Sequence, residues 1–354
     1  MQRTLAQLVR PNILALKAYS SARDEFQAQE GMDYVYFDAN ENPNEQEQVA
    51  INRYPDPRQI TVKKEIGRQR GLHPDNLFLG NGSDEAIDVL FRVFCEPRLD
   101  NVVAINPSYG MYAVCAHIND VALKEVPLNN DFSLNVEAVQ KACDAHTKMI
   151  FLCSPNNPSG NLLKREHVLN IIEGFDGIVI LDEAYIDFAP EGSSWCGLWE
   201  KYPRLVVLQT FSKAWGAAAM RLGLAWASKE IIELMNKVKY PYNVNLLTQK
   251  KALEVLANAD QVQVQMDEIL SERSRLLEAL EHMDEVEEVF PTDANFILVR
   301  VKDANALYDY LIGRGVIVRN RHKQLHCENC LRITVGLPHE NSALLKAIEA
   351  YSVK

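Results

Sequence analysis

Short and almost wholly apolar runs recur through the first two thirds of the chain, separated by segments with helical spacing. The runs lie at 76–80, 102–105, 149–153, 178–181 and 205–209. Apolar runs without alternation are typical of strands that are buried on both faces, as in a parallel sheet covered by helices. The pattern therefore predicts an α/β fold with a mostly parallel central sheet.

The pattern changes after residue 244. Apolar residues at spacings of three and four predict helix over 245–283, and short strands and helices follow to the end of the chain. We expect strands at 295–301, 316–320 and 331–336, and helices at 304–315 and 342–351. This composition predicts a smaller α+β domain. We predict an N-terminal arm (1–30) that packs with it, a large domain (31–244), and a linking helix with the small domain (245–354).

Charge and composition narrow the function classes. The 354 residues carry a net charge of −11, whereas nucleic-acid and membrane-surface binders carry a basic excess. The first twenty residues hold no apolar signal core, and no apolar run is long enough to cross a membrane. Seven scattered cysteines are typical of reduced thiols. We expect a soluble cytoplasmic protein that binds neither nucleic acid nor membrane.

Unusual polar residues follow each predicted strand directly. Because ligands of open α/β sheets bind beyond the carboxyl ends of the strands, we expect these residues to converge on one crevice. Ser83 is the expected N-cap of the helix after the first strand. The converging residues are Gly82, Ser83, Asp84, Tyr109, Asn157, Asp182, Tyr185, Thr210, Ser212 and Lys213.

Lys213 is the most informative of these residues. It follows a buried strand, lies among the hydroxyls of Thr210 and Ser212, and is followed eight residues later by Arg221. A desolvated lysine suits covalent chemistry with an aldehyde cofactor, and hydroxyls with a guanidinium suit a phosphate dianion. Taken alone, the same pattern also fits a surface lysine, just as Asp182 alone fits a helix cap and Asn157 a turn.

The order of these segments resembles the aspartate-aminotransferase superfamily, whose cofactor is pyridoxal 5′-phosphate (PLP). The matching pieces are GNGSDE, NPSYGMY, SPNNPSG, LDEAY, TFSKAWGAAAMRLG and LRITVG. The resemblance implies a catalytic Lys213 that holds PLP covalently. It implies that Asp182 pairs the pyridine nitrogen, that Asn157 and Tyr185 bind the ring's 3-oxygen, and that Tyr109 stacks on the ring.

The same resemblance implies where the phosphate of PLP binds. Its ligands would be Gly82, Ser83, Asp84, Thr210, Ser212 and Arg221. Members of the superfamily are usually homodimers, and Tyr54, in RYPDP, would reach the cofactor of the partner subunit. Taken alone, Tyr54 also fits a tyrosine that packs in its own loop.

The segments RPNILALKAYSSARDE, FDANENP and GVIVRNRHKQ resemble histidinol-phosphate aminotransferases. This resemblance implies amino transfer between L-histidinol phosphate and 2-oxoglutarate in histidine biosynthesis, with imidazole-acetol phosphate and glutamate as products. Arg319, Arg332 and Tyr19 would then bind the substrate's anionic groups. A salt-bridged surface pair is the alternative explanation for the two arginines.

Three other functions stay open from the sequence. An aromatic-amino-acid aminotransferase and a threonine-phosphate decarboxylase would use the same lysine, and a non-catalytic PLP-binding regulator would need a DNA-binding segment. We expect no metal, because Cys327 and Cys330, with His326 beside them, lack a second pair of ligands.

Overall fold

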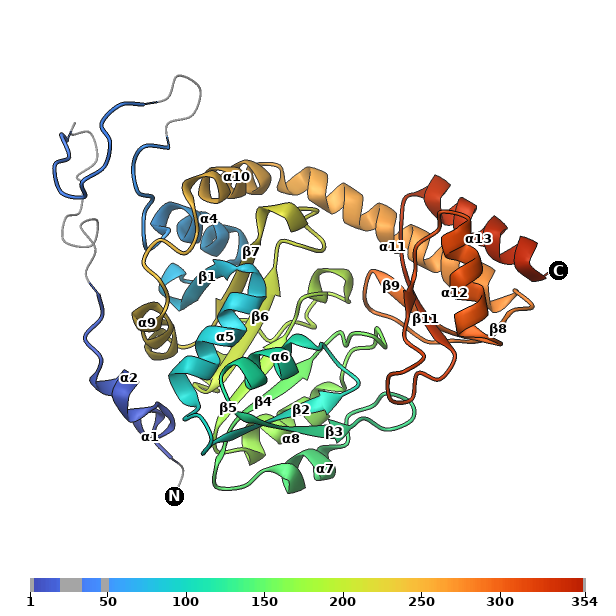
Figure 1. The fold of residues 1–354 in the computed structure, drawn as a ribbon, viewed down its shortest axis with the longest axis horizontal. Helices are drawn as coiled ribbons and strands as arrows, with labels where there is room; N and C mark the ends of the chain where they lie inside the picture. The colour runs from blue at the N-terminus through green and yellow to red at the C-terminus, as the bar shows by residue number, and fades with distance from the viewer. Residues whose placement is uncertain (1–2, 20–33, 46–50, 353–354) are drawn as a thin grey trace. The chain divides into compact units, whose positions relative to one another are not determined.

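The structure is a computed structural model that describes residues 3–19, 34–45 and 51–352. The chain divides into two compact units that are both discontinuous in sequence. The first unit holds residues 1–96 and 197–259, and the second holds 97–196 and 260–354. Figure 1 shows the elements of both. The domain boundary predicted after residue 30 lies outside the described residues, and the one after residue 244 stays a prediction.

The first unit is built around three strands in the order β1-β7-β6. β7 pairs antiparallel with both neighbours. Its Gly223 lies opposite Gly80 of β1 on one side and opposite Thr210 of β6 on the other. The strands are β1 (Leu77–Asn81), β6 (Leu205–Thr210) and β7 (Leu222–Trp226). The main helices are α4 (Ile60–Arg70), α5 (Gly82–Phe94), α9 (Lys229–Val238) and α10 (Leu246–Ala257).

The second unit contains a four-stranded parallel arrangement in the order β5-β4-β2-β3. Helices on the crossovers explain why β2, β4 and β5 are continuous apolar runs in the sequence. The strands are β2 (Asn101–Asn106), β3 (Ala122–Pro127), β4 (Thr147–Cys153) and β5 (Ile178–Asp182). The helices are α6 (Met111–Ile118), α7 (Val136–Ala142) and α8 (Arg165–Gly174).

The C-terminal part of the second unit forms an antiparallel sheet in the order β10-β11-β9-β8. One face of this sheet packs its apolar side chains against helices and forms a separate core. The strands are β8 (Val286–Val289), β9 (Phe296–Val301), β10 (Arg319–Asn320) and β11 (Cys330–Thr334). The helices are α11 (Ala259–Glu281), α12 (Ala304–Gly313) and α13 (Pro338–Ser352).

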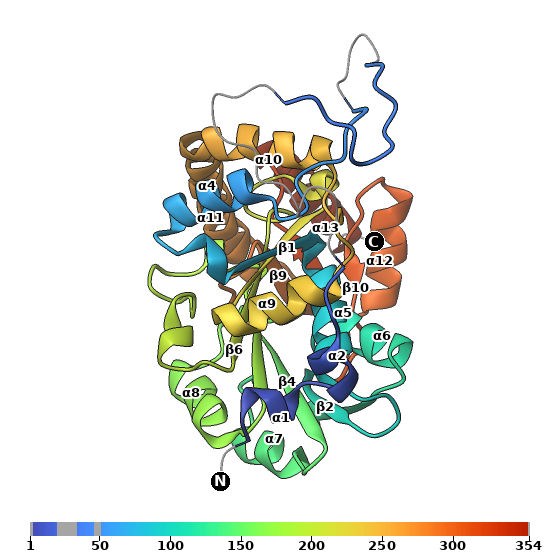
Figure 2. The same cartoon turned by 90° about the vertical axis from the view of Figure 1, so that its left-hand side faces the viewer.

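The described part of the N-terminal arm packs within the first unit, beside α5 and α9 (Figure 2). It contains α1 (Leu5–Leu8) and α2 (Pro11–Ala15). The backbone N–H of Arg10 donates to the Val93 carbonyl at the end of α5, and Lys237 of α9 donates to the Leu14 carbonyl. The burial of Leu8 and Ile13 explains this placement. The expected packing of the arm with the C-terminal segment stays a prediction.

The five apolar runs all form strands, and the predicted mostly parallel sheet is confirmed. Three strands were missed. β3 and β8 are largely exposed, and the segment of β7 was interpreted only for its lysine and arginine. The predicted cap of α5 is also wrong. The helix begins at Gly82, so Asn81 holds the cap position and Ser83 lies in the first turn.

Candidate functional site

The start of α5 and the end of β7 approach each other closely in the first unit. The N–H of Gly82 donates to the carbonyl of Arg221 at 2.9 Å, and Gly82 has the positive φ of +71° that favours glycine. A Cβ atom on Gly223 would lie 2.0 Å from the backbone nitrogen of Ser83. Only glycine therefore allows β7 to lie against the first turn of α5.

Hydroxyl and guanidinium groups gather at this point. The Thr210 hydroxyl lies 3.1 Å from that of Ser212 and accepts the Ser212 N–H. Arg221 donates to the Ser212 hydroxyl and to the Ala218 carbonyl, and lies 3.8 Å from Asp84. We name this group the cradle; it consists of Gly82, Ser83, Asp84, Thr210, Ser212 and Arg221.

The cradle has the donors that an anion requires. The first-turn N–H groups of a helix have no carbonyl partner inside the helix, and the helix dipole favours negative charge there. A Cβ on Gly82 would lie 2.7 Å from a terminal nitrogen of Arg221, so the missing side chain leaves room beside the guanidinium. These features match a phosphate site at a helix N-terminus.

Lys213 lies in the turn that follows β6, next to the cradle in sequence. Its carbonyl accepts the N–H of Gly216 at 3.0 Å, which closes the turn, and Phe211 packs against Trp215. The side chain is exposed. The expectation of a desolvated lysine is therefore not met here, although Phe211 and Ala214 of the same turn are buried.

Asp182 ends β5 in the second unit and is only 2 % exposed. The Tyr112 hydroxyl donates to one carboxylate oxygen at 2.7 Å, and the Ala184 N–H donates to the other at 3.1 Å. Burial, reinforced by the charge of Asp182, raises the pKa of Tyr112 well above its ordinary value. Tyr112 therefore stays a hydrogen-bond donor.

Tyr112 was not found from the sequence. It lies on α6, stacks on Phe151 of β4 and meets the ring of Tyr109 edge-on at 5.7 Å. Tyr109 thus has a fixed neighbour on one side. Tyr109 precedes the first residue of α6, so helical spacing does not connect the two tyrosines, and no sequence signal marked Tyr112.

Asn157 and Arg332 are in contact in the second unit. Arg332 donates through one terminal nitrogen to the amide oxygen of Asn157, and its guanidinium lies over the ring of Phe296. Tyr185 meets the same ring edge-on at 5.0 Å, and burial raises its pKa. Arg332 therefore lies beside both Asn157 and the ring pair of Phe296 and Tyr185, and the roles predicted for these residues stay predictions.

Arg319 lies directly opposite Arg332 in the β10–β11 pair. Like charges in opposite positions of a sheet repel each other, so the pair is unfavourable without an anion. The predicted salt-bridge alternative finds no support, because neither arginine forms an ion pair within the described ranges.

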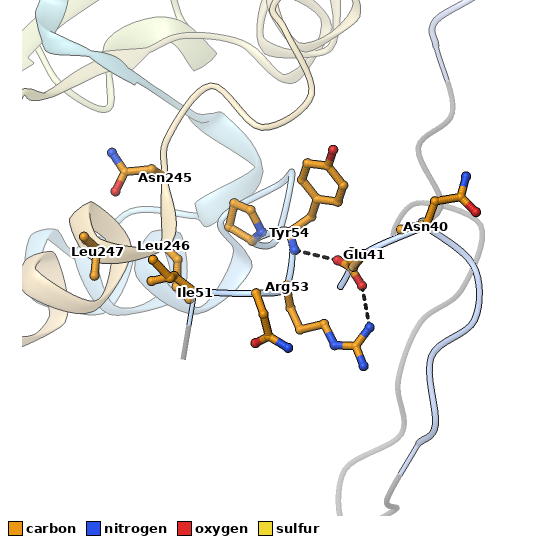
Figure 3. Close-up of a pocket in the computed structure, with 11 residues that line it drawn as sticks. Asn40, Glu41, Ile51, Arg53, Tyr54, Asn245, Leu246 and Leu247 are labelled. Atoms are coloured by element: carbon orange, nitrogen blue, oxygen red, sulfur yellow. Dashed lines mark hydrogen bonds and ion pairs between the residues drawn. The ribbon is translucent and has the colours of Figure 1, made fainter. Parts of the chain in front are cut away.

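Tyr54 and Tyr19 lie in the first unit. Tyr54 is 51 % exposed, stacks on Tyr242 and donates its backbone N–H to Glu41, which also pairs with Arg53. Glu41, Arg53 and Tyr54 line a cavity of about 430 Å³ beside α10 (Figure 3). Tyr19 is 75 % exposed at the end of the described arm.

Cys327 and Cys330 are buried thiols. The Cys330 backbone N–H donates to the Cys327 carbonyl at 2.9 Å, and the Cys330 thiol donates to the Glu328 carbonyl. Within residues 3–19, 34–45 and 51–352, no group of three or more His, Cys, Asp or Glu side chains is placed to hold a metal ion. None of the helices in these ranges is long and apolar enough to span a membrane.

Residues 29–348 match the family described as aminotransferase class I and II. The chain belongs to the class I and II aminotransferases. It is 52% identical over 349 residues to a histidinol-phosphate aminotransferase of Bacteroides fragilis, covering 99% of each chain. It is 50% identical over 343 residues to one of Christiangramia forsetii, covering 97% of each.

Solved structures agree on the fold. A histidinol-phosphate aminotransferase from Clostridium acetobutylicum superposes with a TM-score of 0.79 at 24% identity, over 86% of this chain and 91% of that one. One from Sinorhizobium meliloti, in complex with pyridoxal-5′-phosphate, gives a TM-score of 0.76 at 22% identity, over 85% of this chain and 84% of that one.

The described residues fit PLP. The cradle offers a guanidinium, two hydroxyls and a helix N-terminus to a phosphate. Asp182 offers a buried carboxylate that its neighbours keep fixed, as a pyridine nitrogen requires. The chain is a PLP-dependent transaminase.

Proposed function

We propose that this enzyme moves an amino group from L-histidinol phosphate to 2-oxoglutarate, giving imidazole-acetol phosphate and glutamate in histidine biosynthesis. The observation that carries the proposal is 50–52% identity to histidinol-phosphate aminotransferases over at least 97% of both chains. The opposed Arg319 and Arg332 support it, because both substrates present anions that guanidinium groups bind well.

The cradle and the group formed by Asp182, Asn157 and Tyr185 would bind different parts of PLP. In this proposal the cradle binds the phosphate, Asp182 holds the pyridine nitrogen protonated, and Asn157 and Tyr185 hydrogen bond to the 3-oxygen. Tyr109 stacks on the ring face. PLP, when bound, supplies an electron sink for the charge that develops at the substrate's α-carbon.

Lys213 carries the proton chemistry in this proposal. Lys213 would hold the cofactor through Nζ, and the freed Nζ would act as the base and acid that moves the proton of the substrate's α-carbon. The exposure of Lys213 in the turn after β6 is compatible with this exchange of partners. The ketone product leaves before 2-oxoglutarate binds, so the kinetics are ping-pong.

The remaining parts of the proposal concern assembly and location. The enzyme would be a homodimer in which Tyr54 of the partner subunit reaches the cofactor phosphate, and exposure of Tyr54 supports this role. Tyr19 would close over the substrate phosphate. All seven cysteines are thiols, which suits the reducing cytoplasm.

The donor profile tests the proposal. Purified enzyme is assayed with L-histidinol phosphate, phenylalanine and threonine phosphate, each with 2-oxoglutarate. We expect kcat/KM for histidinol phosphate to exceed that for phenylalanine by at least ~100-fold, since a bound phosphate adds charge-assisted hydrogen bonds. A preference for phenylalanine, or release of carbon dioxide from threonine phosphate, would contradict it.

A further inference from the structure

Three guanidinium groups lie along one face of the C-terminal sheet. Arg319 faces Arg332 across the β10–β11 pair, and Arg321 follows Arg319 by two residues. The Arg321 N–H donates to the Cys330 carbonyl at 2.9 Å, so the extended pairing continues through it. Because side chains alternate along a strand, Arg319 and Arg321 point to the same side. We name these three residues the arginine face.

The opposite side of the same sheet is apolar. On β11, Leu331 and Ile333 flank Arg332 and point to the other side of the sheet. Their partners on β9, Val299 and Ile297, point to the same side, and all four pack into the core with the helices. The arginine face therefore lies on the side that carries Phe296, over which the Arg332 guanidinium is placed. Tyr185 and Asn157 contact this side from the parallel part of the unit.

The arginine face has little compensation for its charge in the described structure. The Nε atoms of Arg321 and Arg332 are buried and make no hydrogen bond within the described ranges. Burial, together with the charges of Arg332 and Arg319, lowers the pKa of Arg321 to about 10, and no carboxylate is among its main influences. Arg53, in contrast, reaches Glu41 at 2.8 Å.

Arg321 and Arg332 are partly buried, whereas Arg319 is exposed. Partly buried cations without a counterion are costly, and a bound anion offsets that cost. A carboxylate has one charge and two oxygens, which two guanidinium groups can serve. A phosphate monoester carries close to two charges and three terminal oxygens, so it can engage a third guanidinium.

We propose that Arg321 is a third substrate-binding arginine, which acts with Arg319 and Arg332 to favour a dianionic phosphate monoester over a carboxylate. This inference rests on the proposed function. Arg321 was absent from the predicted site. Arg319 and Arg332 lie opposite each other in the β10–β11 pair without it. Its contribution is therefore to specificity: the amine donor carries the phosphate, whereas the acceptor carries only carboxylates.

The experiment compares R321Q with R321K and with R314Q as a matched control. Arg314 is an exposed arginine after α12 whose guanidinium lies over Tyr310. Each holoenzyme is tested for KM toward L-histidinol phosphate, KM toward 2-oxoglutarate, and inhibition by inorganic phosphate. The content of bound PLP is measured to confirm that the site is intact.

For R321Q we expect KM for histidinol phosphate and the inhibition constant of phosphate to rise about tenfold, as for one lost charge-assisted hydrogen bond. KM for 2-oxoglutarate should change less than about threefold. R321K should lie between R321Q and the wild type, and R314Q should match the wild type. If R321Q does not fold, R321K takes its place: its KM for histidinol phosphate should still rise more than its KM for 2-oxoglutarate.

Equal changes for both substrates, or unchanged phosphate inhibition, would overturn the role of Arg321. A fall in kcat with both KM values unchanged would also overturn it, since that pattern indicates a structural effect. If the wild-type enzyme does not turn over histidinol phosphate, the proposed function fails. Weaker phosphate binding in R321Q would still support the third arginine in that case.

Discussion

The cradle in the first unit and the arginine face in the second unit both suit anions, but their cations are held differently. Arg221 in the cradle donates to Ser212 and to the Ala218 carbonyl and has Asp84 nearby. Arg332 in the arginine face has one neutral partner, Asn157, and a buried Nε without a hydrogen bond within the described ranges.

This difference matches the ligands that we propose for each place. A cradle fixed by backbone and hydroxyl groups is preorganised for one phosphate that stays bound through many turnovers. Cations that lack carboxylate partners accept different anions in turn, as a ping-pong enzyme requires. The comparison predicts that mutations in the two places will affect different measurements.

The largest effect is expected from Lys213→Ala, which removes the group that moves the proton. Transamination should fall at least ~10³-fold, since general acid–base catalysis and covalent attachment are both lost. Borohydride treatment followed by mass spectrometry should find no cofactor attached to the chain. Lys201→Ala, at an exposed lysine of the same unit, is the control. A reducible adduct at the wild-type level would show that Lys213 is not the attachment site.

The next effect concerns Asp182 and its buried partner. Asp182→Asn should lower kcat at least ~100-fold while PLP stays bound, because a neutral amide does not stabilise a protonated pyridine nitrogen. Tyr112→Phe keeps the carboxylate and removes one hydrogen bond, so kcat should fall about tenfold or less. Equal losses in the two variants would mean that the charge of Asp182 is unimportant.

A pair of arginine substitutions tests the comparison itself. Arg221→Gln should raise the Kd for PLP about 10- to 100-fold and leave KM for both substrates nearly unchanged once PLP is saturating. Arg332→Gln should raise both KM values by a similar factor and leave PLP bound. Titration with PLP and steady-state kinetics give both quantities. If both variants lose PLP, the two places do not act on separate ligands.

The smallest effect is expected from Gly223→Ala, which tests the close approach of β7 and α5. The added Cβ would meet the Ser83 nitrogen, so the backbone has to shift. We expect the free energy of unfolding to fall by about 1–3 kcal/mol, together with weaker PLP binding. Gly313→Ala is the control, because nothing lies within 4 Å of its Cβ position. Equal stability in both variants would remove the packing constraint on the cradle.

The sequence was most informative where burial leaves a continuous apolar run. All five runs became strands, because strands covered on both faces have no polar side. β3 could not be found this way, since only Val126 among its six residues is buried. β7 was not predicted because the segment around Arg221 was interpreted only as a candidate phosphate ligand.

The candidate site could be predicted as far as its residues adjoin strand ends. The contact between Asn157 and Arg332 joins residues 175 positions apart, and that between Tyr112 and Asp182 joins residues 70 apart. Tyr112 was missed because its role depends on such a long-range contact. Arg321 was missed because its place beside Arg319 and Arg332 depends on the pairing that its N–H makes with Cys330. The exposure of Lys213 depends on the turn that follows β6, which residue type does not reveal.

A single-turnover experiment tests the central claim most directly. Holoenzyme is mixed with excess L-histidinol phosphate in the absence of 2-oxoglutarate, and the ketone product is measured. We predict one equivalent of imidazole-acetol phosphate per subunit, with further product only after 2-oxoglutarate is added. Absence of product, or continued formation without the keto acid, would contradict the account.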